Sequence, residues 1–145
     1  MSTSPRRFKD AAYEQVARIG KATSAPKRLE LLDLLCQGPR TVEALANLAA
    51  LSVANASRHL QVLRGARLVE AEKHGVHVEY RLADDDVARF AVALRSLAEA
   101  RLAELAQLTR AYVEDQGALE PVTGDELIRR VRSGEVTVID VRPDD

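Results

Sequence analysis

The stretch Leu51–Leu68, LSVANASRHLQVLRGARL, decides the fold, because it predicts a helix with one apolar stripe and one unusual polar face. Apolar residues recur there at the three- and four-residue spacing of an amphipathic helix. These residues are Val53, Ala56, Leu60 and Leu63. Ser52 directly precedes them, where a hydroxyl accepts hydrogen bonds from the first free backbone N–H groups of a helix.

The opposite face of this predicted helix carries Asn55, Ser57, Arg58, His59 and Gln61. Asn, Ser and His form helices poorly, so they are a poor choice for a face that only has to be soluble. They suit a face that must form hydrogen bonds, since Asn can pair with adenine and Arg with guanine in the major groove. The stretch therefore predicts a recognition helix, and these residues with Ser52 are its candidate DNA contacts.

A shorter helix is predicted just before it, over Thr41–Ala50, with Thr41 as the N-cap. Its apolar side comprises Val42, Leu45, Ala46, Leu48 and Ala49. The interval 50–52 leaves only a tight turn between the two helices, which predicts a helix-turn-helix.

Two strand-like runs follow, Leu68–Lys73 and Val76–Leu82, and a Gly-containing turn joins them as in a β-hairpin. Lys73, His74 and His77 lie at its tip, where we expect contacts with the DNA backbone or the minor groove. Two histidines flanking a turn make only a weak metal site. The sequence predicts no metal ion, no cofactor and no catalytic residue.

The run of residues 31–82 resembles the ArsR/SmtB family of winged-helix repressors, above all in LSVANASRHLQVLRGARLV and EAEKHGVHVEYRL. The resemblance implies a mainly α fold with a small β-hairpin wing (α+β), a winged helix-turn-helix that is dimeric through its terminal helices. It also implies a repressor that binds an inverted-repeat operator in double-stranded DNA as a homodimer. A helical bundle without a nucleic-acid role would explain neither the polar helix face nor the hairpin.

The exit from the recognition helix departs from the family pattern. Family members place Gly just before the Leu-Val that starts the first wing strand, whereas this chain has Arg67 there and Gly65 two residues earlier. Either Arg67 adopts a positive φ at a cost of about 1 kcal/mol, or Gly65 moves the turn.

Helices are also predicted before the helix-turn-helix, over Phe8–Ala22 and from Pro26 to the Gly-Pro pair at Gly38. Lys27 and Arg28 fall in the first turn of the second of these, which is unfavourable for the helix dipole. A phosphate contact and plain solvation are equally good explanations for them.

A long helix is predicted over Asp85–Gln116, because no Pro or Gly occurs in that range. At 1.5 Å per residue it would be about 48 Å long and would overhang a domain of this size. Its stripe, interrupted at Arg101, therefore needs another surface, and a second copy of the chain is the simplest. The predicted dimerisation residues are Phe90, Leu94, Leu97, Leu105, Leu108 and Tyr112.

No complete inducer site is visible. The resemblance places metal-sensing cysteines near the helix that begins here at Thr41, and zinc-binding histidines on the last helix, but neither region carries them. Cys36 is the single cysteine. It is either a small apolar residue packed in a helix face or a thiol sensor.

Residues 117–145 suggest a second segment after the domain of residues 1–116. A short helix capped by Thr123 is followed by an apolar strand, Val136–Val141, that ends in Asp140-Val141-Arg142, and this arrangement resembles the opening of a rhodanese domain. This incomplete segment suggests release from DNA by a reactive-sulfur or thiol-type signal. The alternative function is a sulfurtransferase whose cysteine loop is missing from this chain.

Charge and hydropathy agree with a DNA-binding head. Residues 1–81 carry 13 Lys and Arg against 8 Asp and Glu, whereas residues 82–145 carry 8 against 14. A basic first half favours contact with phosphate. No apolar run approaches 18 residues and no signal peptide opens the chain, so we expect a cytoplasmic protein without membrane contact.

Overall fold

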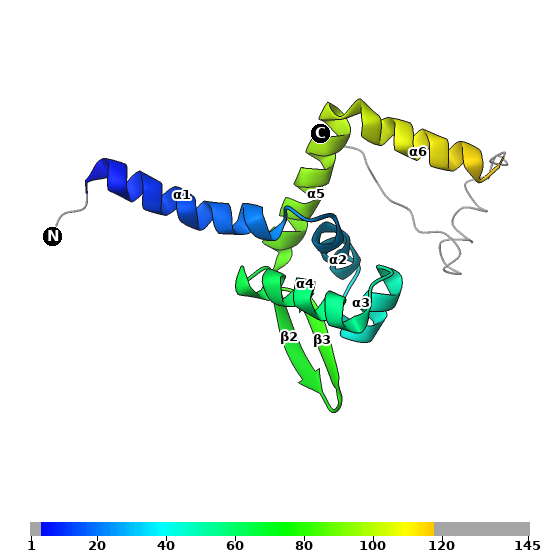
Figure 1. Cartoon of the computed structure of the whole chain (residues 1–145), viewed down its shortest axis with the longest axis horizontal. Coiled ribbons are helices and arrows are strands. Elements are labelled where there is room, and N and C mark those ends of the chain that lie inside the picture. Colours follow the sequence, from blue (N-terminus) through cyan, green and yellow to red (C-terminus); the bar gives the residue numbers. More distant parts are fainter. Residues whose placement is uncertain (1–3, 118–145) are drawn as a thin grey trace. The chain divides into compact units, whose positions relative to one another are not determined.

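The structure is a computed structural model that describes residues 4–117 of the 145, and it is mainly helical with one small antiparallel sheet (Figure 1). The elements in chain order are α1 (Pro5–Ala22), α2 (Pro26–Cys36), β1 (Arg40–Thr41), α3 (Val42–Leu48), α4 (Val53–Gly65), β2 (Val69–His74), β3 (His77–Leu82), α5 (Asp85–Arg101) and α6 (Ala103–Asp115). Contacts divide the chain into two units, with the boundary after Val92. The predicted winged helix-turn-helix is confirmed.

The helix-turn-helix forms from the residues that local chemistry favours. Thr41 Oγ1 accepts a hydrogen bond from the Ala44 amide at 3.2 Å, and Ser52 Oγ accepts one from the Asn55 amide at 3.1 Å. Each hydroxyl thus satisfies a donor that a helix N-terminus leaves free. Both predicted N-caps are therefore confirmed.

One hydrophobic core lies beneath α4. Its largest fully buried side chains are Leu31, Leu32, Leu45, Leu60, Leu63 and Val69. Ala56 is buried with them as predicted, but Val53 is 50% exposed and Leu48 is 48% exposed. These two predictions of burial are wrong, because Val53 starts α4 and Leu48 ends α3, beside the turn that faces solvent.

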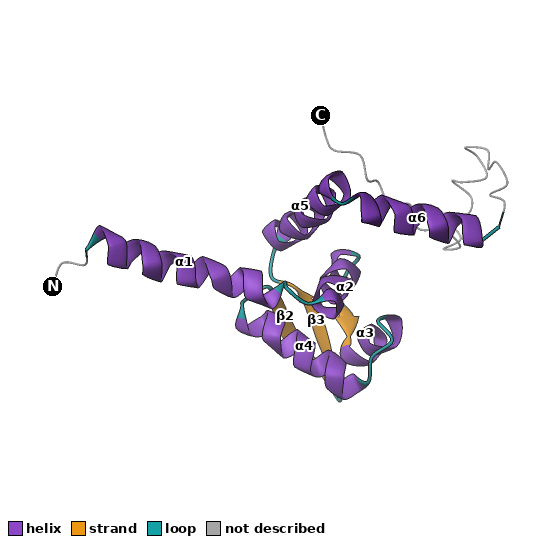
Figure 2. Ribbon diagram, turned by 45° about the horizontal axis from the view of Figure 1, so that its top comes forward, coloured by secondary structure: helices purple, strands orange, loops and turns teal. Residues whose placement is uncertain are grey.

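The sheet has the strand order β1-β3-β2 (Figure 2). Antiparallel pairing aligns Val69 with Leu82 at one end of the hairpin and His74 with His77 at the other. Gly75 has a φ of 61° as the first residue of the two-residue turn, the position where a type II′ turn needs glycine. The sequence did not predict β1, because a two-residue strand has no periodicity.

Arg67 has a φ of 62°, whereas Gly65 lies inside α4 without a positive φ. The Arg67 amide donates to the Arg64 carbonyl at 2.9 Å, and the Leu68 amide donates to the Leu63 carbonyl at 3.0 Å. This pair of bonds is a Schellman motif, which normally ends in glycine. Of the two predicted alternatives, the structure shows the one in which Arg67 adopts the left-handed conformation.

Two predictions about helices need correction. The continuous helix over Asp85–Gln116 is wrong, because Leu102 has an extended φ of −108° and ψ of 99° and separates α5 from α6. The break falls where Arg101 interrupts the apolar stripe, and Leu102 provides no side-chain cap. α1 starts at Pro5, earlier than predicted, because Ser4 caps it. Within residues 4–117, no helix is long and apolar enough to cross a membrane.

Lys27 and Arg28 bind backbone carbonyls at the ends of other helices. Lys27 Nζ donates to the Ala49 carbonyl at 2.6 Å, just after α3. Arg28 Nε donates to the Ala22 carbonyl at 2.6 Å, at the end of α1. Positive charge at a helix C-terminus is favourable. These contacts, rather than solvation alone, account for the two cations in the first turn of α2.

Candidate nucleic-acid interface

The solvent face of α4 presents a set of polar side chains that the domain itself does not use. Asn55, Arg58 and Gln61 are exposed, while Ala56, Leu60 and Leu63 bury the opposite face. Within residues 4–117, the side chains of Asn55, Arg58 and Gln61 form no hydrogen bond or ion pair. The buried stripe therefore fixes the rotation of α4 and leaves these groups free to bind a ligand.

The other candidate residues of α4 lie closer to the domain. Ser57 is half-buried, and the Ser52 hydroxyl is engaged as the N-cap. His59 is also half-buried, and its Nδ1 lies 3.4 Å from Nη1 of Arg28 on α2. The contacts of these three residues with DNA stay predictions.

The hairpin of β2 and β3, here called the wing, has two chemically different faces. Alternation along the strands places Lys73 on the same face as Val69 and Tyr80, both of which are buried in the core. The other face carries Glu70, Glu72, His74, His77, Glu79 and Arg81. We call this second face the acidic face.

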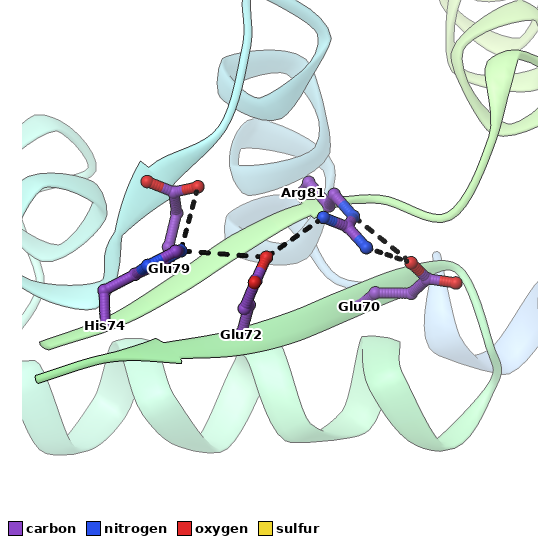
Figure 3. A network of polar contacts seen from close by, with 5 residues as sticks. All are labelled: Glu70, Glu72, His74, Glu79 and Arg81. Carbon is purple, nitrogen blue, oxygen red and sulfur yellow. Dashed lines mark hydrogen bonds and ion pairs between the residues drawn. The ribbon is translucent and has the colours of Figure 1, made fainter.

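Figure 3 shows the polar network on the acidic face. Glu72 and Glu79 lie directly opposite each other, a like-charge pairing that destabilises a sheet. Arg81 offsets it by pairing with Glu72 at 3.3 Å and with Glu70 at 3.1 Å. His74 Nε2 lies 3.7 Å from Glu72 and 3.9 Å from Glu79.

His77 extends this network toward the helix-turn-helix, because its Nδ1 lies 3.9 Å from Glu43 on α3. Both wing histidines are thus next to carboxylates, whereas Lys73 forms no ion pair among the described residues. The described part of the chain holds no group of three His, Cys, Asp or Glu residues that could bind a metal ion.

The wing glutamates Glu70, Glu72 and Glu79 were not predicted as part of the site. Glu70 and Glu72 recur with His74 at a period of two, which places these residues on one side of β2, and Glu79 joins them through the pairing of β2 with β3. An acidic face repels phosphate. The geometry therefore favours Lys73, on the other face, as the wing residue that approaches a DNA backbone.

Cys36 is exposed at the last position of α2. The interpretation of Cys36 as packed filler is therefore wrong, because the helix ends there and the buried face of α2 is supplied by Leu31, Leu32 and Leu35. Partial burial still raises the pKa of the Cys36 thiol. The thiol is accessible, but less of it is thiolate at neutral pH than in a free cysteine.

The six predicted dimerisation residues are exposed or half-buried within residues 4–117. Phe90, Leu97, Leu108 and Tyr112 are exposed, and Leu94 and Leu105 are half-buried. The resemblance also implied pairing through the first helix, and on α1 Phe8, Tyr13 and Val16 are exposed, Tyr13 by 69%.

Comparison with known proteins gives concordant matches. A sequence model described as "Bacterial regulatory protein, arsR family" matches residues 25–71. A helix-turn-helix-type transcriptional regulator of Mycobacterium tuberculosis is 43% identical over 136 residues, which are 93% of this chain and 59% of that protein. The chain thus spans about three-fifths of that relative. The regulator CmtR of Mycobacterium bovis is 37% identical over 101 residues, which are 70% of this chain and 76% of CmtR.

Solved structures agree with the fold. A solution structure from Mycobacterium bovis, described as a homodimeric winged helix-turn-helix DNA-binding domain, is 42% identical with a TM-score of 0.63. The match covers 70% of this chain and 93% of that one. The crystal structure of NolR from Sinorhizobium fredii is 33% identical with a TM-score of 0.55, covering 70% and 96% of the two chains.

Proposed function

This chain belongs to the arsR family of bacterial transcriptional regulators, and from that premise we propose that it is a repressor that binds an inverted-repeat operator as a homodimer. In this proposal α4 lies in the major groove, and Asn55 and Arg58 contact base edges. The domain of residues 1–116 carries this function, and residues 117–145 lie outside it.

The observation that carries the proposal is the free polar face of α4. Arg58 is exposed and unpaired within residues 4–117, on a helix whose other side is fixed by three fully buried residues. An arginine in this setting has five donors available in a rigid fork, which matches the acceptors of guanine. Lys73 supplies a charge contact from the wing that carries no base information.

The experiment compares Arg58→Ala with Arg64→Ala, a matched loss of one exposed arginine from the last turn of α4. Fluorescence anisotropy measures the binding of each variant to the preferred operator and to a random duplex. Arg58→Ala should lower the discrimination between the two by about 1–3 kcal/mol, because a paired base contact is lost. Arg64→Ala should not. Equal losses of Arg58→Ala on both duplexes would remove Arg58 from the base-contacting set.

Homodimer formation rests on uncovered apolar side chains. Phe8, Tyr13 and Val16 on α1 and Phe90 and Leu97 on α5 are all exposed. Exposed apolar residues at helical spacing are characteristic of a protein interface. A related winged-helix domain is described as homodimeric, which supports the same assembly here.

We also propose that a reactive-sulfur or thiol-type signal releases DNA, with Cys36 as the modified group. Exposure of Cys36 supports access, whereas its raised pKa slows the reaction because the thiolate is the nucleophile. The rhodanese-like stretch, including Thr123 and the strand Val136–Val141, lies outside the described residues. The test is polysulfide treatment of the parent and of Cys36→Ser. The parent should release the operator, and release by both would exclude Cys36 as the acceptor.

A further inference from the structure

A shallow surface depression of about 360 Å³, largely open to solvent, lies beside the C-terminal end of α4, at the end of α1 and the start of α2. Its cationic lining residues are Arg18, Lys21 and Arg28, and its apolar lining residues are Ala22, Val62 and Ala66. A neighbouring cavity of about 370 Å³ shares Arg18 and Ala66 and adds Arg67. We call the first of these the α1/α4 cavity.

The α1/α4 cavity is lined by three cationic side chains, and the carbonyls at the C-terminal ends of α1 and α4 offset only part of their charge. No carboxylate of the described residues lines it. Arg18 donates to the Gly65 carbonyl at 3.3 Å, and Arg28 donates to carbonyls at the end of α1. These carbonyls carry the partial negative charge of a helix C-terminus, roughly half an elementary charge for each helix, so they offset part of the two guanidinium charges and leave a net positive charge. Lys21 Nζ has no hydrogen-bond or ion-pair partner within residues 4–117. Convergent cations of this kind favour an anion.

The lining also indicates what kind of anion would fit. Sites for small organic molecules have volumes of roughly 300–1,000 Å³ and combine apolar walls with a few convergent polar groups. The three apolar residues provide such a wall, and a bare inorganic ion or a DNA phosphate would leave it unused. A small carboxylate with an apolar body would engage both parts of the lining.

The two arginines of the α1/α4 cavity also contact α4. Arg18 Nη2 holds the Gly65 carbonyl, and Arg28 Nη1 lies 3.4 Å from His59 Nδ1. A carboxylate in the cavity would compete for both guanidiniums. At 1.5 Å per residue, Gly65 lies about 15 Å along the same helix from Asn55. Any shift at the end of α4 therefore reaches the face that contacts bases through one rigid element.

We propose that the α1/α4 cavity binds a small organic carboxylate with an apolar body, and that its occupancy changes the affinity of α4 for DNA. The second half of this statement rests on the proposed function, whereas the binding itself does not. Loss of one lining cation removes a charge-assisted hydrogen bond and should weaken binding about tenfold.

The test uses benzoate as the probe and benzamide as its neutral counterpart, added to the full 145-residue chain at constant ionic strength. Backbone amide shifts of Val62, Gly65 and Ala66 are followed by NMR. Benzoate should shift them saturably and benzamide should not. Lys21→Gln should weaken benzoate binding about tenfold, whereas Lys9→Gln, a matched loss of an exposed lysine on α1 outside the cavity, should leave it unchanged.

Absence of saturable shifts, equal shifts with benzamide, or equal effects of the two lysine variants would overturn the binding site. If a random duplex shifts the same amides and benzoate does not, the cations contact DNA phosphate and the proposal is wrong. Operator affinity is then measured with and without saturating benzoate, and an unchanged value would overturn the coupling to α4. If the chain binds benzoate but no operator, the proposed function and the coupling to α4 are wrong, whereas the proposed carboxylate site is supported.

Discussion

Arg67 adopts a left-handed backbone conformation that glycine favours and arginine does not. Its φ of 62° costs an L-residue with a Cβ atom about 1 kcal/mol or more, and the two Schellman hydrogen bonds hold it there. Ala50 repeats the situation at the end of α3 with a φ of 55°. Both helices of the helix-turn-helix therefore end without the glycine that this turn favours.

Replacing Arg67 with glycine should accordingly stabilise the fold. The left-handed strain is removed, and the larger conformational freedom of glycine in the unfolded chain offsets part of the gain. We expect the free energy of unfolding in urea to rise by up to about 1 kcal/mol. Arg64→Gly, inside the last turn of α4, is the control and should lower it by roughly 0.5–1 kcal/mol. If Arg67→Gly lowers the free energy of unfolding instead, the contacts of the arginine side chain stabilise the fold by more than the left-handed backbone destabilises it.

At this scale the sequence predicted what local chemistry determines. The hydroxyl caps Thr41 and Ser52 follow from residue type and position alone, and the structure confirms both. The exposure of Val53 and Cys36 could not be predicted in the same way, because it depends on where a helix ends relative to the core. Spacing identifies a stripe but does not say how far along the helix the core extends.

The wing is an element whose charge is divided between its faces. Lys73 lies on the face opposite Glu70, Glu72 and Glu79. Hydropathy alternation predicted the two strands, but the acidic face requires the register that pairs Glu72 with Glu79. Similarly, apolar spacing predicted a helix over Asp85–Gln116, but the extended backbone at Leu102 was not foreseen because no Pro or Gly marks it.

The division of charge gives a prediction with opposite signs for two neighbouring residues. Lys73→Ala should weaken binding to all DNA sequences alike and reduce the salt slope by about one charge contact, because it removes a phosphate partner. Glu72→Gln should strengthen binding to all sequences, because it removes a negative charge near the DNA and relieves the pairing with Glu79. Anisotropy titrations at several salt concentrations measure both. A sequence-dependent loss from Lys73→Ala would place it on a base edge instead.

On the scale of the whole molecule, a DNA-binding head is combined with helices whose apolar side chains are exposed within residues 4–117. Leu97 is 57% exposed on α5, within the stripe predicted for a second copy. A homodimer would cover such residues and would duplicate α4, so that the operator must be an inverted repeat. Assembly and operator symmetry are therefore one prediction.

Selection of binding sites from a randomised DNA duplex library by the full chain measures operator sequence and symmetry directly. We expect enrichment of an imperfect inverted repeat whose half-sites are about 34–36 Å apart or a multiple of that. Leu97→Asp, which places an unpaired charge in the proposed interface, should sediment as a monomer and enrich this repeat far less. Recovery of no preferred sequence, or of a single half-site by a chain that sediments as a monomer, would contradict the account.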